Sequence, residues 1–321
     1  MSNIKVSVMC MTYNHEKYIE KALEGFVNQK TNFEFEVLVH DDASTDGTTS
    51  IIRQYQKRYP NIIKPIYQVE NQYSKGVKIT KEILVPQAKG IYFAFCEGDD
   101  YWTSTDKLQL QYEYMEAHPE CSICVHQATQ YDCTYKYKRM MTSYYEDCDI
   151  SVNEIIRIGG GCFATNSVFM RNEVLTQMPE CFKAKDFGDY QLFIYGAICG
   201  KCHYISKSMS VYNYGTEGSW TNRVSKNREK KIAHYQELIR MLKCVDDYYR
   251  GQYSTDICFK ISESEYEMYR LQGNFIKILS RKYRMFYERS KKNGEFPLKE
   301  SIVIKYPILL KLKNNILHSM K

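Results

Sequence analysis

Apolar, strand-like runs that alternate with helix-like spacings constrain this chain most. The runs IKVSVMC (4–10) and FEVLV (35–39) are apolar and rich in β-branched residues, as buried parallel strands are. Between them, apolar residues recur at the spacing of one helix face from Tyr18 to Val27, and Asn14 is the predicted N-cap. Because strands separated by helices pair in parallel, this order predicts an α/β sheet flanked by helices.

The same alternation continues to the end of the first third of the chain. A predicted helix follows HDDASTDGTT and ends at Pro60, and a strand is expected over 62–67. A helix over 83–88 and the strand GIYFAFC (90–96) come next. The fold class is therefore α/β, with a mainly parallel, Rossmann-like central sheet.

Beyond Trp102 the pattern becomes mixed and then helical. A helix (108–118) and strands near 122–126 and 167–171 predict α+β additions, whereas two helical stripes occupy 232–245 and 266–286. We therefore predict one domain over 1–224, with halves of about 1–102 and 103–224. A helical C-terminal appendage is expected over 225–321.

Composition narrows the class of protein. A chain of 321 residues with 44% hydrophobic residues can bury a full core, which excludes a disordered or fibrous protein. The start MSNIKVSVMC runs directly into a strand without the pattern of an export signal, so the twelve cysteines are expected to be reduced thiols in the cytosol. The net charge of +6 is spread along the chain until its C-terminal part, which disfavours nucleic acid as a partner.

Carboxylates follow the predicted strands, where ligands bind in open α/β sheets. An isolated acidic pair at a strand end is usually a helix cap or a solvated turn, but three clusters in register favour a binding site. The clusters are Asp41 and Asp42; Glu97, Asp99 and Asp100; and Asp186 and Asp189.

The segment CEGDDYW (96–102) has the chemistry of a hard-cation site. It places three acids directly after an apolar strand. Mg²⁺ or Mn²⁺ takes one or two protein carboxylates and completes its shell with water and substrate phosphates. A diphosphate is the natural co-ligand, because the metal offsets the charge on a departing nucleoside diphosphate.

Four motifs in this order and spacing resemble glycosyltransferase family 2, the inverting enzymes with a GT-A fold. They are VSVMCMTYN, FEVLVHDDASTDGT, GIYFAFCEGDDYW and FGDYQLF. The resemblance covers roughly residues 4–220, and CEGDDYW resembles a subgroup associated with bacterial surface polysaccharides.

The resemblance implies a donor site and a metal site. Tyr13 and Asp42 would contact the nucleobase, with Asp41 beside them. Glu97 and Asp99 would occupy the family's Asp-x-Asp position. Asp99 is then the metal ligand, Glu97 reaches the ribose or a metal-bound water, and Asp100 orients the donor sugar.

The resemblance also implies an acceptor side. Asp189 occupies the place of the catalytic base, with Asp186 as its rival, and an N-cap is the structural alternative for Asp189. Thr165 and Asn166 would line the acceptor cleft. In VYNYGTEGSW (211–220), many relatives carry a histidine that completes the metal site; this chain has Asn213 there, and Trp220 can stack on donor or acceptor.

The expected activity is inverting transfer from a nucleotide diphosphate sugar, UDP-linked in preference to GDP- or dTDP-linked, in bacterial surface polysaccharide synthesis. The partners would be that donor and a saccharide or lipid-linked saccharide acceptor. One alternative is a non-catalytic nucleotide-sugar-binding or assembly protein. Another is a sugar nucleotidyltransferase, but the glycine-rich phosphate loop expected of that class is missing after the first strand.

Three further segments allow alternatives. CSICVH (121–126) and CGKCH (199–203) are either core thiols or a structural zinc site. Gly159 to Gly161 predicts a flexible turn. The basic, partly apolar segment 302–321 is either a helix docked on the catalytic domain or an interfacial helix. The second option would place the protein peripherally on the inner face of the plasma membrane.

Overall fold

The computed structural model describes residues 3–142, 144–182, 188–217, 219, 222 and 227–295. The chain divides into two compact units, Met1–Arg223 and Val224–Lys321, and each is described by itself.

The first unit contains all of the strands found in the described residues. They are β1 (Ile4–Thr12), β2 (Glu34–Asp41), β3 (Ile63–Tyr67), β4 (Tyr92–Phe95), β5 (Tyr101–Trp102), β6 (Cys121–Asp132), β7 (Tyr137–Met140), β8 (Cys148–Ile150), β9 (Phe169–Arg171) and β10 (Lys201–Tyr214).

The helices of this unit lie between the strands. The α-helices are α1 (Ile19–Val27), α2 (Thr48–Arg58), α3 (Lys107–Ala117), α4 (Val152–Ile158), α5 (Asn172–Thr176) and α6 (Gly188–Cys199). The 3₁₀ turns are η1 (Tyr73–Lys75), η3 (Val85–Gln87), η4 (Thr165–Ser167) and η5 (Glu180–Phe182). The element η2 (Ile79–Leu84) is a π-helical turn.

A single sheet orders its strands β3-β2-β1-β4-β9-β6-β10-β5, with β7 paired to β6 and β8 to β10. The run from β3 to β4 is parallel, as predicted. The rest is mixed: β9 runs antiparallel to both β4 and β6, while β6 and β10 are parallel. The pairing of β6 with β10 is the longest in the sheet, so the sheet is mainly parallel as expected, and the antiparallel strands are short additions to it. One of them, β7, follows β6 after a short turn, and such a turn can join only antiparallel strands.

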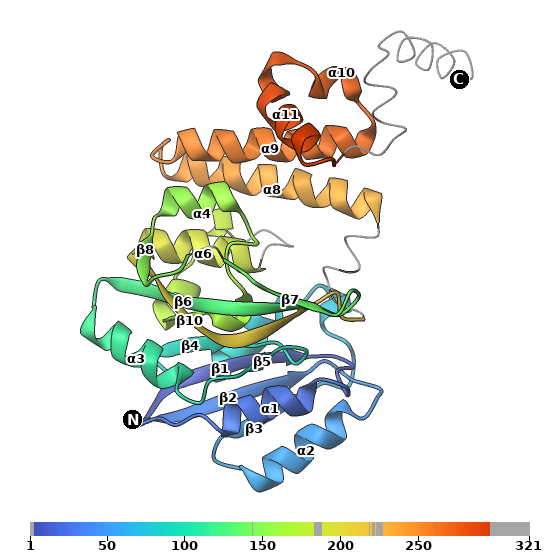
Figure 1. The fold of residues 1–321 in the computed structure, drawn as a ribbon. Coiled ribbons are helices and arrows are strands. Elements are labelled where there is room, and N and C mark those ends of the chain that lie inside the picture. The colour runs from blue at the N-terminus through green and yellow to red at the C-terminus, as the bar shows by residue number, and fades with distance from the viewer. Residues whose placement is uncertain are drawn as a thin grey trace. The chain divides into compact units, whose positions relative to one another are not determined.

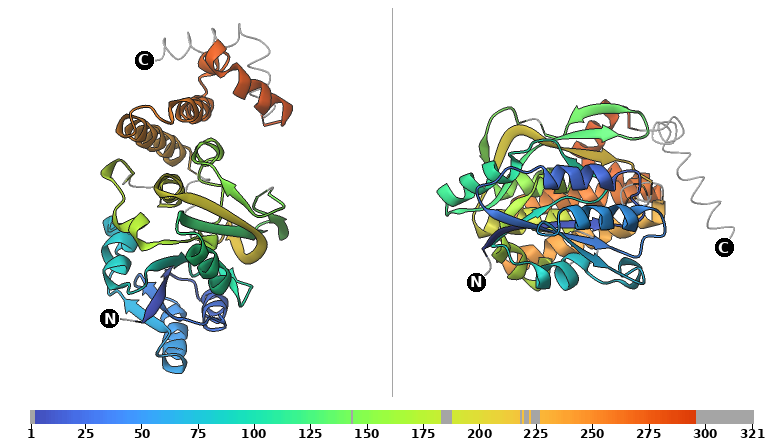
Figure 2. Two further views of the ribbon diagram at one scale, coloured as in Figure 1. Left: turned by 90° about the vertical axis from the view of Figure 1, so that its left-hand side faces the viewer. Right: turned by 90° about the horizontal axis from the view of Figure 1, so that it is seen from below.

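Helices cover the sheet on both sides. α2 packs on β3 and against α1, and both α3 and α6 pack on β6. In Figure 1, α4 and α6 are drawn above β6 and β10 while α3 lies below them, and Figure 2 gives two further views of these layers. The arrangement is the mixed α/β, GT-A-like fold expected from the sequence.

Two local predictions are corrected. Asn14 does not cap α1, which begins at Ile19 without a side-chain cap. Asn14 instead adopts a left-handed conformation (φ 55°) and binds the loop after β2. The helix predicted over 83–88 is the end of a π-helical turn followed by the 3₁₀ turn η3, in which Pro86 lacks the N–H that a longer helix needs.

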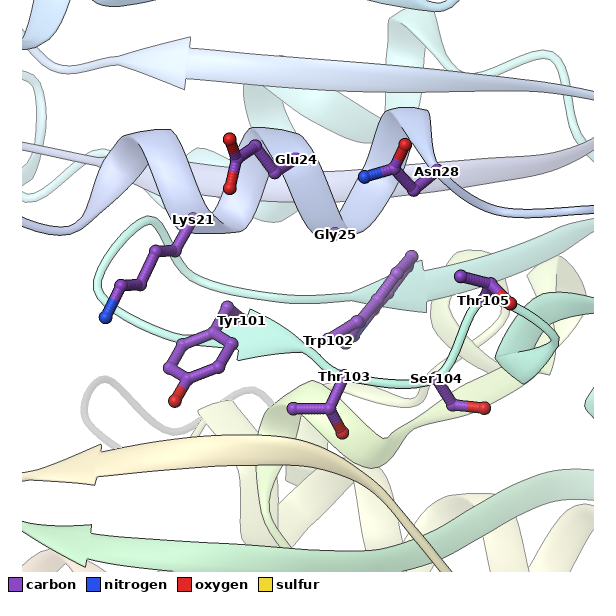
Figure 3. A pocket seen from close by; sticks show the side chains of 9 residues that line it. All are labelled: Lys21, Glu24, Gly25, Asn28, Tyr101, Trp102, Thr103, Ser104 and Thr105. Atoms are coloured by element: carbon purple, nitrogen blue, oxygen red, sulfur yellow. The ribbon is translucent and has the colours of Figure 1, made fainter.

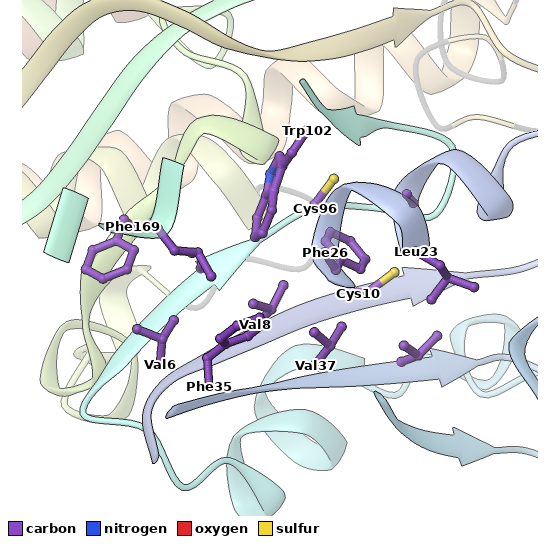
Figure 4. Close-up of a cluster of buried hydrophobic side chains, with 14 of the residues drawn as sticks. Val6, Val8, Cys10, Leu23, Phe26, Phe35, Val37, Cys96, Trp102 and Phe169 are labelled. Carbon is purple, nitrogen blue, oxygen red and sulfur yellow. The ribbon is translucent and has the colours of Figure 1, made fainter. Parts of the chain in front are cut away.

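The main core lies between α1 and the parallel strands. Figure 4 shows Val8 and Cys10 of β1 facing Leu23 and Phe26 of α1, with Trp102 beside them. The rings of Phe26 and Trp102 meet edge to face, with centroids 4.9 Å apart. This packing holds Trp102 at the end of β5, shortly after the acidic segment.

The second unit is helical in its described residues. Its elements are α8 (Arg228–Tyr248), α9 (Ser254–Gln272), α10 (Phe275–Ile278), η6 (Arg281–Tyr283) and α11 (Arg284–Lys292). The stripe predicted over 232–245 lies within α8, but the stripe over 266–286 is broken after α9, where Gly273 takes a positive φ (70°). None of the described helices is both long and apolar enough to span a membrane.

Candidate functional site

The parallel strands β1, β2 and β4 bring three polar segments to one edge of the sheet. Asp42 N donates to Thr12 O (3.0 Å), and Gly98 N donates to Met11 O (2.9 Å). The segments after β1, β2 and β4 therefore meet at the carboxyl ends of the strands, where the sequence placed the candidate site.

The segments after β1 and β2 are joined by a network of hydrogen bonds. Asn14 N donates to Ser44 Oγ (2.9 Å), and Asn14 Oδ1 accepts from Thr45 N (2.8 Å). His15 N donates to Thr48 Oγ1 (2.8 Å). Tyr13, next to this network in the sequence, is 45% exposed, so its ring is free to contact a ligand.

Asp41 and Asp42 are buried, and their oxygens hold neighbouring loops. Asp42 accepts from the amides of Gln72 (2.7 Å) and Tyr73 (3.1 Å). Asp41 accepts from Thr49 Oγ1 (2.5 Å) and from a backbone amide of its own turn. Both carboxylates thus shape the wall of the site, which sequence spacing alone did not indicate.

Asp99 has one engaged and one available carboxylate oxygen. Thr216 Oγ1 donates to its Oδ2 (2.7 Å), and Asn213 Nδ2 donates to its backbone oxygen (2.5 Å). Within the described part of the chain, Oδ1 of Asp99 accepts no hydrogen bond. Asn213 therefore holds the Asp99 backbone, and Thr216 orients its carboxylate.

Asp100 points into the protein. Its Oδ1 accepts from Asn213 N (2.8 Å) and its Oδ2 from Asn166 Nδ2 (2.9 Å), and the residue is 1% exposed. Burial raises the pKa of Asp100 well above its usual value, and the charges of Asp99 and Glu97 add to the effect. Asp100 joins the acidic segment to β10 rather than presenting its carboxylate at the surface.

Asn166 is likewise buried, with no exposed surface. Besides Asp100, its side chain contacts Val211 O (2.9 Å) and Ser210 Oγ (2.6 Å). Its polar atoms are therefore used inside the sheet. Of the two residues expected to line the acceptor cleft, only Thr165 is partly exposed.

Asp99 and Asp189 both act electrostatically on Glu97. Burial raises the pKa of Glu97 to about 8, and the negative charges of Asp99 and Asp189 contribute. Asp189 lies in the first turn of α6 and accepts a hydrogen bond from Thr165 Oγ1 (2.5 Å). Burial raises the pKa of Asp189, whereas the bond from Thr165 lowers it.

The sequence interpretation missed His15. A Cβ at Gly98 would lie 2.6 Å from Thr12 Oγ1 and 3.0 Å from His15 Nδ1, so the imidazole borders the acidic segment. Burial lowers the pKa of His15, while the charges of Asp99, Asp46 and Asp41 oppose that shift. The available signal was its position in TYNH, directly after β1.

The oxygen donors fit a hard divalent cation that is completed by substrate. Across the residues that the structure describes, no three Asp, Glu, His or Cys side chains form a full metal cage. Mg²⁺ or Mn²⁺ needs only one or two carboxylates when phosphates and water supply the rest. Asp99, with one free oxygen, and Glu97 beside it meet that requirement.

Some predicted residues lie elsewhere. Asp186, Trp220 and the segment 302–321 fall outside the described residues. For the segments CSICVH and CGKCH, the sequence allows either core thiols or a zinc site. All twelve cysteines are free thiols, and Nδ1 of His203 in the second segment lies 2.8 Å from Oδ1 of Asp149, with which it forms a hydrogen bond. Gly159 ends α4 as part of a turn.

A separate pocket of about 320 Å³ lies between α1 and β5 (Figure 3). Lys21 of α1 points toward Tyr101 across it, with its Nζ 5.5 Å from the ring centroid, and Glu24 and Thr103 also line the pocket. None of the predicted site residues lines this pocket, so the candidate site is defined by the strand ends and not by this cavity.

Comparisons with known proteins give one family and several relatives. The model described as glycosyl transferase family 2 matches residues 7–175. An uncharacterised protein of Mycobacterium tuberculosis is 33% identical over 226 residues, which are 70% of this chain and 63% of that protein. The Escherichia coli protein named UDP-Glc:α-D-GlcNAc-diphosphoundecaprenol β-1,3-glucosyltransferase WfaP is 33% identical over 35% of this chain and 41% of its own.

Two solved structures share the fold. TarS of Staphylococcus aureus with UDP-GlcNAc has a TM-score of 0.55 and 19% identity, covering 86% of this chain and 82% of that one. The mannosyltransferase PcManGT of Pyrobaculum calidifontis with GDP-Man and Mn²⁺ has a TM-score of 0.57 and 15% identity, covering 95% and 84%.

Proposed function

Because this chain belongs to glycosyl transferase family 2, we propose that it transfers a sugar from a nucleotide diphosphate donor to an acceptor hydroxyl, with inversion at the anomeric carbon. The observation that carries the proposal is the convergence of Glu97, Asp99 and Asp189. The segment after β4 would supply the metal-binding carboxylate and the start of α6 the proton-accepting one, and Asp189 and Asp99 both act electrostatically on Glu97.

The nucleobase of the donor is proposed to bind at the edge of the sheet where β1 and β2 end. Tyr13 offers an exposed ring, and Asp42 fixes the amides of Gln72 and Tyr73 beside it. Asp41 holds the adjoining turn. A UDP-linked sugar is supported by the donor that the name of the Escherichia coli relative states.

Asp99 is proposed to hold Mn²⁺ or Mg²⁺ through its free Oδ1, and Glu97 is placed to reach a metal-bound water or the ribose. When bound, the cation supplies Lewis-acid stabilisation of the departing diphosphate. Thr216 and Asn213 keep Asp99 in place, which is a role that neighbouring residues of metal ligands commonly have. Asp100 supports the same segment from inside the sheet.

Asp189 is proposed as the general base. The acceptor oxygen attacks the anomeric carbon, its proton passes to the Asp189 carboxylate, and the bond from that carbon to the diphosphate breaks. The raised pKa of Asp189 makes its ionised form a stronger base than an ordinary aspartate. Because Asp189 lies in the first turn of α6, a contribution to the helix start and catalysis are compatible.

The acceptor is proposed to be a saccharide, free or lipid-linked, in bacterial surface polysaccharide synthesis. The acceptor named for the Escherichia coli relative, a diphosphoundecaprenol-linked GlcNAc, supports the lipid-linked form. It also motivates a peripheral contact with an anionic membrane on the cytoplasmic side.

Donor turnover separates this proposal from a non-catalytic binder. Purified protein would be offered UDP-, GDP- and dTDP-sugars with Mn²⁺ or Mg²⁺ and candidate acceptors, beside the variants Asp99→Asn and Asp189→Asn. We expect Asp99→Asn to lose metal-dependent donor binding and Asp189→Asn to keep binding but lose turnover. Glu113→Gln, an exposed acid of α3, is the matched control. Binding of donors by the wild type without turnover would favour the non-catalytic alternative.

A further inference from the structure

We propose that the segment from α10 to α11 (275–292), here called the basic corner, docks on the surface of a membrane rich in anionic phospholipid. This inference deepens the proposed function, because it gives the expected membrane contact a location among the described residues.

Positive charge is concentrated in the basic corner. It contains seven Lys or Arg residues and one acid, Glu288, which leaves a net charge of +6. That value equals the formal net charge of the whole chain, so the other residues balance to zero. An anionic leaflet attracts clusters of this kind over about one Debye length.

Much of this charge is not neutralised within the protein. Lys282 pairs with Glu265 (2.6 Å) and Arg289 with Glu263 (2.5 Å), both on α9. By contrast, four exposed basic residues form no ion pair with any described residue, and they remain available to phosphate headgroups. They are Arg281, Arg284, Lys291 and Lys292.

Apolar side chains are exposed among these cations. Ile276 is 60%, Met285 58% and Leu279 38% exposed. Their neighbours Phe275 and Phe286 are buried in the core of the second unit. The basic corner is therefore packed against that core, and the three apolar side chains are exposed on a folded surface. Figure 1 shows α10 and α11 beside α9.

Exposed apolar residues beside free cations favour a membrane over a soluble polyanion. A nucleic acid would use only the cations, whereas a bilayer takes up the apolar side chains and pairs with the charges. The chemistry of the basic corner therefore matches phospholipid headgroups and the upper acyl region.

The test is co-sedimentation of the full chain with vesicles of phosphatidylcholine alone or mixed with phosphatidylglycerol, without donor. Three forms are compared: wild type, Arg281→Gln/Arg284→Gln, and Ile276→Gln/Met285→Gln. We expect binding to the mixed vesicles only. Each lost cation should weaken the partition coefficient about fivefold, and the apolar pair should weaken it about tenfold or more.

Matched controls lie on exposed positions of the first unit. Lys57→Gln/Lys138→Gln removes two cations, and Val69→Gln replaces a side chain that is 96% exposed. Both controls should bind like the wild type. Circular dichroism and the melting temperature establish that each variant is folded.

Two results would contradict the proposal that the basic corner docks on a membrane. One is equal binding of wild type and corner variants to the mixed vesicles. The other is binding to a short DNA duplex as strong as to vesicles and unaffected by Ile276→Gln/Met285→Gln. Turnover of a soluble acceptor is measured in parallel, so a failure of docking and a failure of the proposed catalysis give different results.

Discussion

The hydroxyl of Thr165 donates a 2.5 Å hydrogen bond to Oδ2 of Asp189. The two residues come from η4 and the first turn of α6 and are 24 positions apart. The bond stabilises the ionised carboxylate, whereas burial favours the protonated form. The proton affinity of the proposed base therefore depends on burial and on a hydrogen bond from a residue of a different element.

Replacing Thr165 with Val should move the pH dependence of the reaction. Asp189 must be ionised to accept a proton, so the rate falls as pH drops through its raised pKa. Loss of the donor removes a stabilising contact of the ionised form and raises the pKa of Asp189 further. The acid limb of kcat/KM should shift to higher pH, while Thr176→Val on α5 should leave it in place. An unmoved limb in Thr165→Val would argue against Asp189 as the base.

Gly98→Ala should damage the donor site. The new Cβ would lie 2.6 Å from Thr12 Oγ1 and 2.7 Å from Thr12 Cβ, distances at which the backbone of the acidic segment must shift. We expect donor affinity to fall about tenfold or more, measured by calorimetry with metal present. Gly161→Ala is the control, because a Cβ there meets no atom within 4 Å. Equal affinity of both variants would contradict the proposed position of the donor.

Lys107 should make the stability of the protein depend on pH. Its side chain is fully buried. The Nζ atom donates a hydrogen bond to Gln111 Oε1 (2.7 Å) and lies 4.2 Å from the ring centroid of Trp102. Burial lowers its pKa to about 7, whereas an unfolded lysine titrates near 10.4.

Between these two values, the unfolded chain binds more protons than the folded one, so this group makes stability rise with pH. Relative to Lys107→Met, the free energy of unfolding of the wild type should increase by up to about 1.4 kcal/mol per pH unit from pH 7 to 10. Urea unfolding at several pH values checks this. A constant difference between the two proteins across that range would show that Lys107 keeps its ordinary pKa.

Asn166→Ala should destabilise the fold in addition to lowering activity. The change leaves buried acceptors on Asp100 and Val211 without a donor, at a cost of about 2–4 kcal/mol. Its unfolding midpoint in urea should drop clearly, while Asn61→Ala, at an exposed position, should stay near wild type. If Asn166→Ala lost activity with unchanged stability, Asn166 would contact substrate and our reading of its contacts would be wrong.

Local sequence patterns determined the order of the elements in the first third of the chain. Apolar runs and helix spacings are short-range signals, and they predicted β1, β2, β4 and the parallel pairing between them. The positions of Asp99 and Asp189 at a strand end and a helix start followed from the same signals. The roles of these two residues stay predictions that the experiments above address.

Only the tertiary structure decided which polar groups share hydrogen bonds. Asp100, Asn166 and Asn213 lie far apart in the sequence, yet they meet because β10 and η4 lie against the acidic segment. The same holds for Thr165 and Asp189. Side-chain direction and burial depend on long-range packing, so no local spacing reveals that Asp100 turns inward while Asp99 keeps one oxygen free.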